Sequence, residues 1–224
     1  MKSRKAKLWL KTVVTLVLMG FVLFLTAGTF NYWQAWTFLG VGAVSNGLLT
    51  LSITRNPTLL ENRSRFGPAA EKRTTQKIIV LCAGIPAVAT FLIPALDRRF
   101  GWSNVSDWLS IVGDVFIMAG LGMVYRVFKA NAFGSATIEI ADDQKVISTG
   151  PYAMVRNPMY AGAAVYLIGT SLALGSYWGL IAALLTVVGL VGRLFDEEKF
   201  LAQNLSGYSE YCAKVRWHLV PGIF

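Results

Sequence analysis

Two short polar stretches carry the residue types best suited to chemistry, and the first spans residues 150–162, G-P-Y-A-M-V-R-N-P-M-Y-A-G. Asn157 can cap a helix by accepting a backbone N–H with its side-chain oxygen. Pro158 suits the first helical position, where no N–H is needed. We therefore expect a helix to begin here, directly after Tyr152 and Arg156. Because a helix start carries free N–H groups and partial positive charge, this stretch suits an anion.

The second stretch is R-L-F-D-E-E-K-F-L, residues 193–201. Arg193 and Glu197 are four residues apart, so they share one helix face. Acidic residues at the C-terminal end of a helix are electrostatically disfavoured, which adds weight to a functional role for Glu197 and Glu198. Each stretch also has a structural interpretation, as a capped helix touching lipid phosphate through Arg156 or as an acidic helix exit.

The elements that must position these residues are apolar helices. The 224-residue chain is 54% hydrophobic and only 15% charged, with a mean hydropathy of +0.52, whereas soluble domains carry about 25% charged residues. A membrane-spanning helix needs about 20 apolar residues. Six runs meet or approach that length, at about 8–30, 35–53, 78–96, 108–128, 158–174 and 177–195. We therefore predict one all-α integral membrane domain of about six helices.

The last two runs bring the two polar stretches together. A tight turn at Gly175-Ser176 makes them antiparallel neighbours. The end of one run then lies beside the start of the other. We expect Arg193, Glu197 and Glu198 to face the stretch from Asn157 to Tyr160.

Positive charge predicts the orientation of the bundle. With six spans, nineteen of the 21 Lys and Arg residues fall on one side, and Arg98 and Arg99 fall on the other. Because basic residues mark the cytoplasmic side, both termini and both polar stretches are expected to be cytoplasmic.

Several other classes of site are not indicated. Cys82 and Cys212 lie in an apolar run and in the tail, and His218 is the one histidine, so neither a disulfide framework nor a metal site is expected. The net charge of +9 follows the one-sided distribution of Lys and Arg that is typical of membrane proteins, so a nucleic-acid partner is not indicated. Asp114, the one acidic residue inside an apolar run, is interpreted as structural.

The motifs resemble those of a known family. K-V-I-S-T-G-P-Y-A-M-V-R-N-P-M-Y-A-G, D-E-E-K-F-L, G-Y-S-E-Y and V-R-W-H-L-V-P, within residues 145–221, are similar to the isoprenylcysteine carboxyl methyltransferase family. That family is related to the membrane phospholipid N-methyltransferases. N-P-T-L-L-E-N-R at 56–63 loosely resembles the family's Pro-Glu-Leu-Leu-x-x-Arg loop.

The resemblance implies a membrane enzyme that uses S-adenosyl-L-methionine and releases S-adenosyl-L-homocysteine. It implies four helices in residues 1–128, and a cofactor-binding loop, helical hairpin and tail in 129–224. It implies an acceptor that is lipid-like or prenylated and comes from the bilayer, with neither metal nor nucleic acid as a partner. The catalytic candidates are Arg193, which would face the acceptor, Arg156 and Glu198. The cofactor-binding candidates are Lys145, Val146, Ile147, Ser148, Gly150, Tyr152, Asn157, Pro158, Met159, Tyr160 and Glu197.

One departure leaves the acceptor open. The eukaryotic esterifying enzymes have R-H-P where this chain has R-N-P, and Asn157 cannot act as a base. Arg193 can orient a carboxylate acceptor, whereas an amine acceptor would need Glu197 or Glu198 as a base. A small thiol is a further candidate acceptor. Two other classes are a non-enzymatic membrane protein and a nicotinamide-dependent membrane reductase with the same C-terminal arrangement.

Overall fold

The structure is a computed structural model that describes residues 2–62, 74–131 and 145–224. These residues form helices and connecting segments, without strands among them, so the all-α prediction is confirmed. The elements are α1 (Lys2–Ala27), α2 (Trp33–Arg55), α3 (Pro57–Asn62), α4 (Thr74–Phe100), α5 (Asp107–Ala130), a 3₁₀ helix (Gly150–Ala153), α6 (Pro158–Ala173), α7 (Tyr177–Asn204) and α8 (Tyr208–Lys214).

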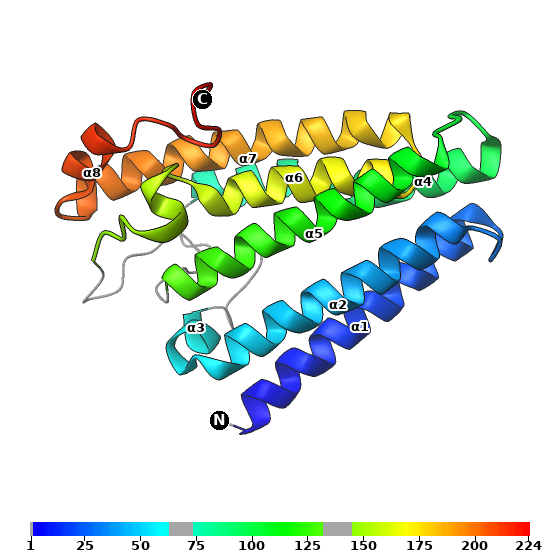
Figure 1. Cartoon of the computed structure of the whole chain (residues 1–224), viewed down its shortest axis with the longest axis horizontal. Helices are drawn as coiled ribbons and strands as arrows, with labels where there is room; N and C mark the ends of the chain where they lie inside the picture. Colours follow the sequence, from blue (N-terminus) through cyan, green and yellow to red (C-terminus); the bar gives the residue numbers. More distant parts are fainter. Residues whose placement is uncertain (1, 63–73, 132–144) are drawn as a thin grey trace.

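The long helices lie side by side and alternate in direction along the chain (Figure 1). α6 packs against both α5 and α7, α4 packs against α7, and α1 and α2 pair beside them. The N-terminus, α3, the 3₁₀ helix and α8 gather at one end of the bundle, which we call the site end. The turns from α1 to α2, α4 to α5 and α6 to α7 lie at the opposite end.

The six apolar runs correspond to six long helices, but five of them meet the length and composition of a membrane span in the described part. The exception is α6, which has 16 residues. At about 1.5 Å per residue it is roughly 24 Å long, shorter than a hydrocarbon core of about 30 Å. α6 nevertheless runs from the site end to the far turn beside α7 (Figure 1). Of the six helices expected, five are therefore long enough to span a membrane, and the sixth, α6, is shorter.

Glycines allow α5 and α6 to approach at backbone distance. A Cβ atom added to Gly113 would lie 2.2 Å from the Ala173 nitrogen, and one added to Gly120 would lie 2.5 Å from the Gly162 carbonyl oxygen. Both distances are too short for any side chain. Helices in membranes associate by close van der Waals packing of small residues, since the lipid offers no hydrophobic drive. This contact fixes α6, and therefore its first turn, against α5.

A buried carboxylate fixes the far turn. Asp97, at the end of α4, accepts hydrogen bonds from the Ser103 backbone nitrogen at 2.6 Å and the Ser103 hydroxyl at 2.6 Å. The Ser176 hydroxyl also donates to it, at 2.5 Å. The same hydroxyl accepts from the Gly179 nitrogen and caps α7. The Gly175-Ser176 hairpin is thus confirmed, and it is tied to α4 by an acid that accepts three hydrogen bonds.

α7 continues well beyond the apolar run that predicted it. The run ends near Phe195, whereas the helix ends at Asn204. The intervening residues include Glu, Lys, Leu and Ala, which are good helix formers, so the helix persists after the apolar pattern stops. Glu197 and Glu198 therefore lie within a helix and not at its exit, and the unfavourable electrostatics expected for a helix C-terminus do not apply to them.

Candidate active site

The start of α6 differs from the prediction in how it is capped. Asn157 is the residue before the helix, but its side chain caps no backbone N–H. Its Nδ2 instead donates to Glu198 Oε1 at 2.5 Å. This bond to a carboxylate orients the amide group toward Glu198, and Oδ1 accepts no backbone N–H of α6. The predicted side-chain cap is therefore wrong, and the first turn of α6 keeps no side-chain oxygen from Asn157.

Tyr160 joins the two polar stretches. Its hydroxyl donates to Glu197 Oε2 at 2.6 Å and accepts from Arg193 Nε at 3.1 Å. Tyr160 is 7% exposed, whereas Arg193 and Glu197 are half-buried. The predicted meeting of the two stretches is thus confirmed. A cation and an anion are held on one phenol hydroxyl, within the first turn of α6.

Glu198 lies one residue further along α7 and serves a different set of partners. Its Oε1 receives Asn157 Nδ2 and lies 2.9 Å from His218 Nδ1. Its Oε2 lies 3.4 Å from Arg156 Nη1, and both side chains of this ion pair are largely buried. Glu198 therefore links α7, the start of α6 and the C-terminal tail.

Arg156 holds the C-terminal tail against the start of α6. Its Nε donates to the Val215 carbonyl oxygen at 2.6 Å, and its Nη2 to that of Cys212 at 2.8 Å. The backbone nitrogens of Arg156 and Asn157 donate to the carbonyl oxygens of Trp217 and His218, at 2.9 and 3.0 Å. The sequence analysis missed this role of the tail and of His218. The one available signal was the similarity of V-R-W-H-L-V-P to the family pattern.

Tyr152 is held by both of its ends. Asn131 Nδ2 lies 3.2 Å from its hydroxyl, and the Tyr211 hydroxyl donates to its carbonyl oxygen at 2.8 Å. Burial raises the pKa of Tyr211, so this residue stays an uncharged donor at ordinary pH. The ring of Tyr152 packs, with Met159, on a core cluster at the ends of α2 and α5. Tyr152 and Met159 therefore lie where the sequence placed them, beside the start of α6.

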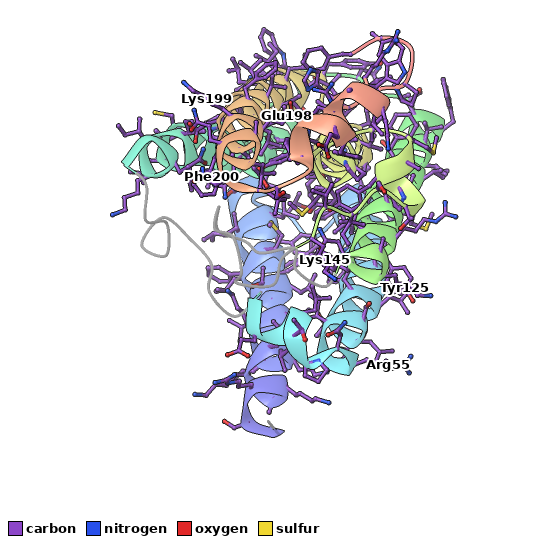
Figure 2. All side chains as sticks on the ribbon, turned by 90° about the vertical axis from the view of Figure 1, so that its left-hand side faces the viewer. Arg55, Tyr125, Lys145, Glu198, Lys199 and Phe200 are labelled. Atoms are coloured by element: carbon purple, nitrogen blue, oxygen red, sulfur yellow. The ribbon has the colours of Figure 1, made fainter. Side chains whose placement is uncertain are left out.

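The remaining cofactor-binding candidates lie in the segment that precedes Tyr152 in the chain. Residues 145–148 have no regular secondary structure and precede Gly150, which begins the 3₁₀ helix with a φ of +61°. Lys145 and Ser148 are exposed, and Val146 and Ile147 are half-buried. A Cβ added to Gly207, just before α8, would lie 4.0 Å from Val146, so the segment passes close to the turn between α7 and α8. Lys145 and Glu198 both lie at the site end (Figure 2).

Asp114 is not part of this arrangement. It lies in the first half of α5, which begins at the far end of the bundle, and it is 7% exposed. Its Oδ1 finds no hydrogen-bond partner among the described residues. Within the described ranges no group of three or more His, Cys, Asp or Glu side chains is placed to hold a metal ion.

Comparison with known proteins gives a family match that covers the α6 and α7 residues of this site. The model of the family described as phospholipid methyltransferase matches residues 108–207. The resemblance to membrane methyltransferases of the isoprenylcysteine and phospholipid type is confirmed. The match runs from the start of α5 to the turn before α8, so it includes Tyr160, Arg193 and Glu197.

Two curated proteins from rice, one from Oryza sativa subsp. indica and one from subsp. japonica, are each 26% identical to this chain over 126 residues. Both are described as probable protein-S-isoprenylcysteine O-methyltransferases. The alignment covers 55% of this chain and 64% of each rice protein. Less than two thirds of those relatives is therefore matched.

Proposed function

We propose that this chain is an integral membrane methyltransferase that takes its methyl group from S-adenosyl-L-methionine and passes it to a lipid-like acceptor. The observation that carries the proposal is the hydroxyl of Tyr160, which holds Glu197 and Arg193 together beside the start of α6. Tyr160 thus fixes one anionic and one cationic side chain next to each other, and each can bind a different group. Both lie within the region matched by the family model.

The residues around Tyr160 fit the amino-acid end of the cofactor. The start of α6 has no side-chain cap, so its backbone N–H groups suit the methionine carboxylate. The Glu197 carboxylate suits the ammonium group, and the rings of Tyr152 and Tyr160 suit the sulfonium or the adenine. The cofactor supplies an electrophilic methyl group on sulfur. We assign the approach to this site to residues 145–148 and Gly150, and its wall to Asn157, Pro158 and Met159.

Arg193 favours a carboxylate as the acceptor. Arg193 precedes Glu197 by one helical turn on α7, so it lies farther from the end of this helix at Asn204. A planar guanidinium holds a carboxylate through two parallel hydrogen bonds, which orients the attacking oxygen. A carboxylate arrives ionised, so the transfer needs alignment and exclusion of water more than acid–base help. We therefore place carboxyl O-methylation of an isoprenylcysteine-like acceptor first, in agreement with the description of the rice relatives.

A phospholipid amine is the second candidate, because the matching family model is described as phospholipid methyltransferase. An amine must lose a proton, which requires a base. Glu198 is poorly placed for that task, since its two oxygens already face Asn157, His218 and Arg156. We propose that Glu198 and Arg156 position the start of α6, and that Glu197, which accepts from the Tyr160 hydroxyl, would be the base for an amine acceptor.

The test is radiolabelled methyl transfer by the purified protein. The donor is S-adenosyl-L-methionine labelled in the methyl group, and the acceptors are a farnesylcysteine, phosphatidylethanolamine vesicles and a small thiol. We expect incorporation into the farnesylcysteine as a base-labile ester. Base-stable label in the phospholipid would establish the second candidate, and label in the thiol would contradict both. No incorporation together with no cofactor binding would reject the methyltransferase and leave the reductase or a non-enzymatic protein.

A further inference from the structure

A hollow lies at the site end, between helices that carry no residue of the proposed Tyr160, Glu197 and Arg193 site. It has a volume of about 420 Å³ and is formed by α2, α3 and α5. Its polar lining comes from Ser52, Arg55, Asn56 and Lys129, and its apolar lining includes Leu51 and Tyr125. Viewed from the site end, Arg55 and Tyr125 lie on one side, and Glu198 lies on the other (Figure 2). We call this hollow the α2–α5 groove.

The mouth of the α2–α5 groove carries two positive charges. Arg55 is in the last turn of α2 and Lys129 in the last turn of α5, and both side chains are exposed. Among the described residues, no carboxylate pairs with either cation. Lys129 Nζ lies 5.6 Å from the centre of the Tyr125 ring, a cation–π contact that holds the ammonium over the groove. Two cations at one opening favour an anion.

The inner wall of the groove is apolar and well packed. Leu59 is 1% exposed and Phe128 is 7% exposed, and both belong to the core cluster at the ends of α2 and α5. Asn56 Oδ1 accepts from the Leu59 nitrogen at 3.2 Å, which holds α3 across the end of the groove. The groove therefore combines a cationic mouth, at the level of the helix ends, with an apolar wall along the helices.

We propose that the α2–α5 groove binds the headgroup and upper chain of an anionic phospholipid. Basic pockets between membrane helices at the headgroup level bind such lipids. A free phosphate would match the cations but would leave the apolar wall unused. A neutral lipid would match the wall but would leave both cations unpaired. This site is separate from Tyr160, Glu197 and Arg193, so it goes beyond the proposed function and does not depend on it.

The experiment measures lipid retention by native mass spectrometry, without cofactor, on protein purified from mixed phosphatidylglycerol and phosphatidylcholine. The test variant is Arg55→Gln/Lys129→Gln. The matched control is Arg126→Gln/Lys214→Gln, because Arg126 is an exposed basic residue on the same helix, three positions from Lys129, and Lys214 is exposed on α8. We expect the wild type and the control to retain phosphatidylglycerol preferentially. The test variant should lose about tenfold of that preference, since each basic residue near the surface contributes a few-fold.

Three results would overturn the proposal. Equal preference in the test variant and the wild type would remove the groove as the site. An equal loss in the control would show that general surface charge is responsible. Inorganic phosphate that raises the melting temperature as much as phosphatidylglycerol does would indicate a site for free anions. If the double variant does not purify as a folded protein, Lys129→Gln alone is compared with Arg126→Gln, and a loss of a few-fold is expected for Lys129→Gln only.

Discussion

At the scale of single residues, the hydroxyl of Tyr160 is used both as a hydrogen-bond donor and as a hydrogen-bond acceptor. It donates its proton to Glu197 and accepts from Arg193 Nε. The guanidinium is therefore held by its Nε edge, in a fixed direction relative to the Glu197 carboxylate. Lysine has no equivalent of Nε and no planar fork, so charge alone would not reproduce this arrangement.

The prediction for Arg193 follows from that geometry. In Arg193→Lys, methyl transfer should fall by about tenfold or more, because a lost charge-assisted hydrogen bond costs about 1.5–3 kcal/mol. The affinity for S-adenosyl-L-methionine should stay nearly unchanged, since Glu197 and the start of α6 remain. Transfer rate and calorimetric affinity are measured on the same preparation. Loss of cofactor binding with an unchanged apparent affinity for the acceptor would mean that the two roles are reversed.

Residue types and spacing predicted this part of the site well, with one instructive error. The four-residue spacing placed Arg193 and Glu197 on one face, and the hairpin placed that face beside Tyr160, as the hydrogen bonds confirm. The helix start at Pro158 was also correct. The side-chain cap by Asn157 was wrong, because its amide is turned toward Glu198, a partner on another helix that accepts from Nδ2. Local sequence preference cannot include a partner that is 41 residues away.

At the scale of elements, the C-terminal tail is part of the site's support. Arg156 holds the Cys212 and Val215 carbonyl oxygens while its backbone holds Trp217. Burial raises the pKa of the Cys212 thiol, and the charge of Arg156 partly offsets that effect. The thiolate is the reactive form, so a docked tail keeps Cys212 slow to react at pH 8.

Cys212 can therefore report on tail docking. Arg156→Lys keeps the positive charge but loses the fork that joins the tail, so the tail should undock more often. In a Cys82→Ser background, a water-soluble maleimide should label Cys212 several-fold faster at pH 8, because undocking lowers the thiol pKa and exposes the sulfur. Arg216→Lys, at an exposed tail position, is the control and should leave the rate unchanged. Equal rates in the wild type and Arg156→Lys would show that Arg156 does not hold the tail.

The elements themselves were predictable to different degrees. The apolar runs located all six long helices, because the signal for burial in lipid is strong and continuous. They placed the end of α7 nine residues too early, since its last turns are helical without being apolar. They also missed α3 and α8, which are short helices in polar segments. The tail's contacts with Arg156 and Glu198 join distant segments and leave no periodic trace in the sequence.

At the scale of the whole molecule, the alternation of helices places the N-terminus, α3 and α8 at the site end (Figure 1). Nineteen of the 21 basic residues are expected at that end, with Arg98 and Arg99 at the other. We therefore predict that both termini are cytoplasmic. Reporter fusions after Phe224 and near Ser103 should report opposite sides of the membrane. Agreement between the two reporters would mean that α6, with its 16 residues, does not cross the membrane.

We propose that Glu197, beside the uncapped start of α6, holds the amino-acid end of S-adenosyl-L-methionine. This is tested by calorimetric titration of the purified protein. The wild type should bind S-adenosyl-L-methionine and S-adenosyl-L-homocysteine but not NADPH. Glu197→Gln should bind both of the former more weakly by roughly 1.5–3 kcal/mol, because both keep the ammonium group. Glu210→Gln, at an exposed position on α8, should bind them as the wild type does. Unchanged affinity in a folded Glu197→Gln protein, or binding of NADPH instead, would contradict the claim.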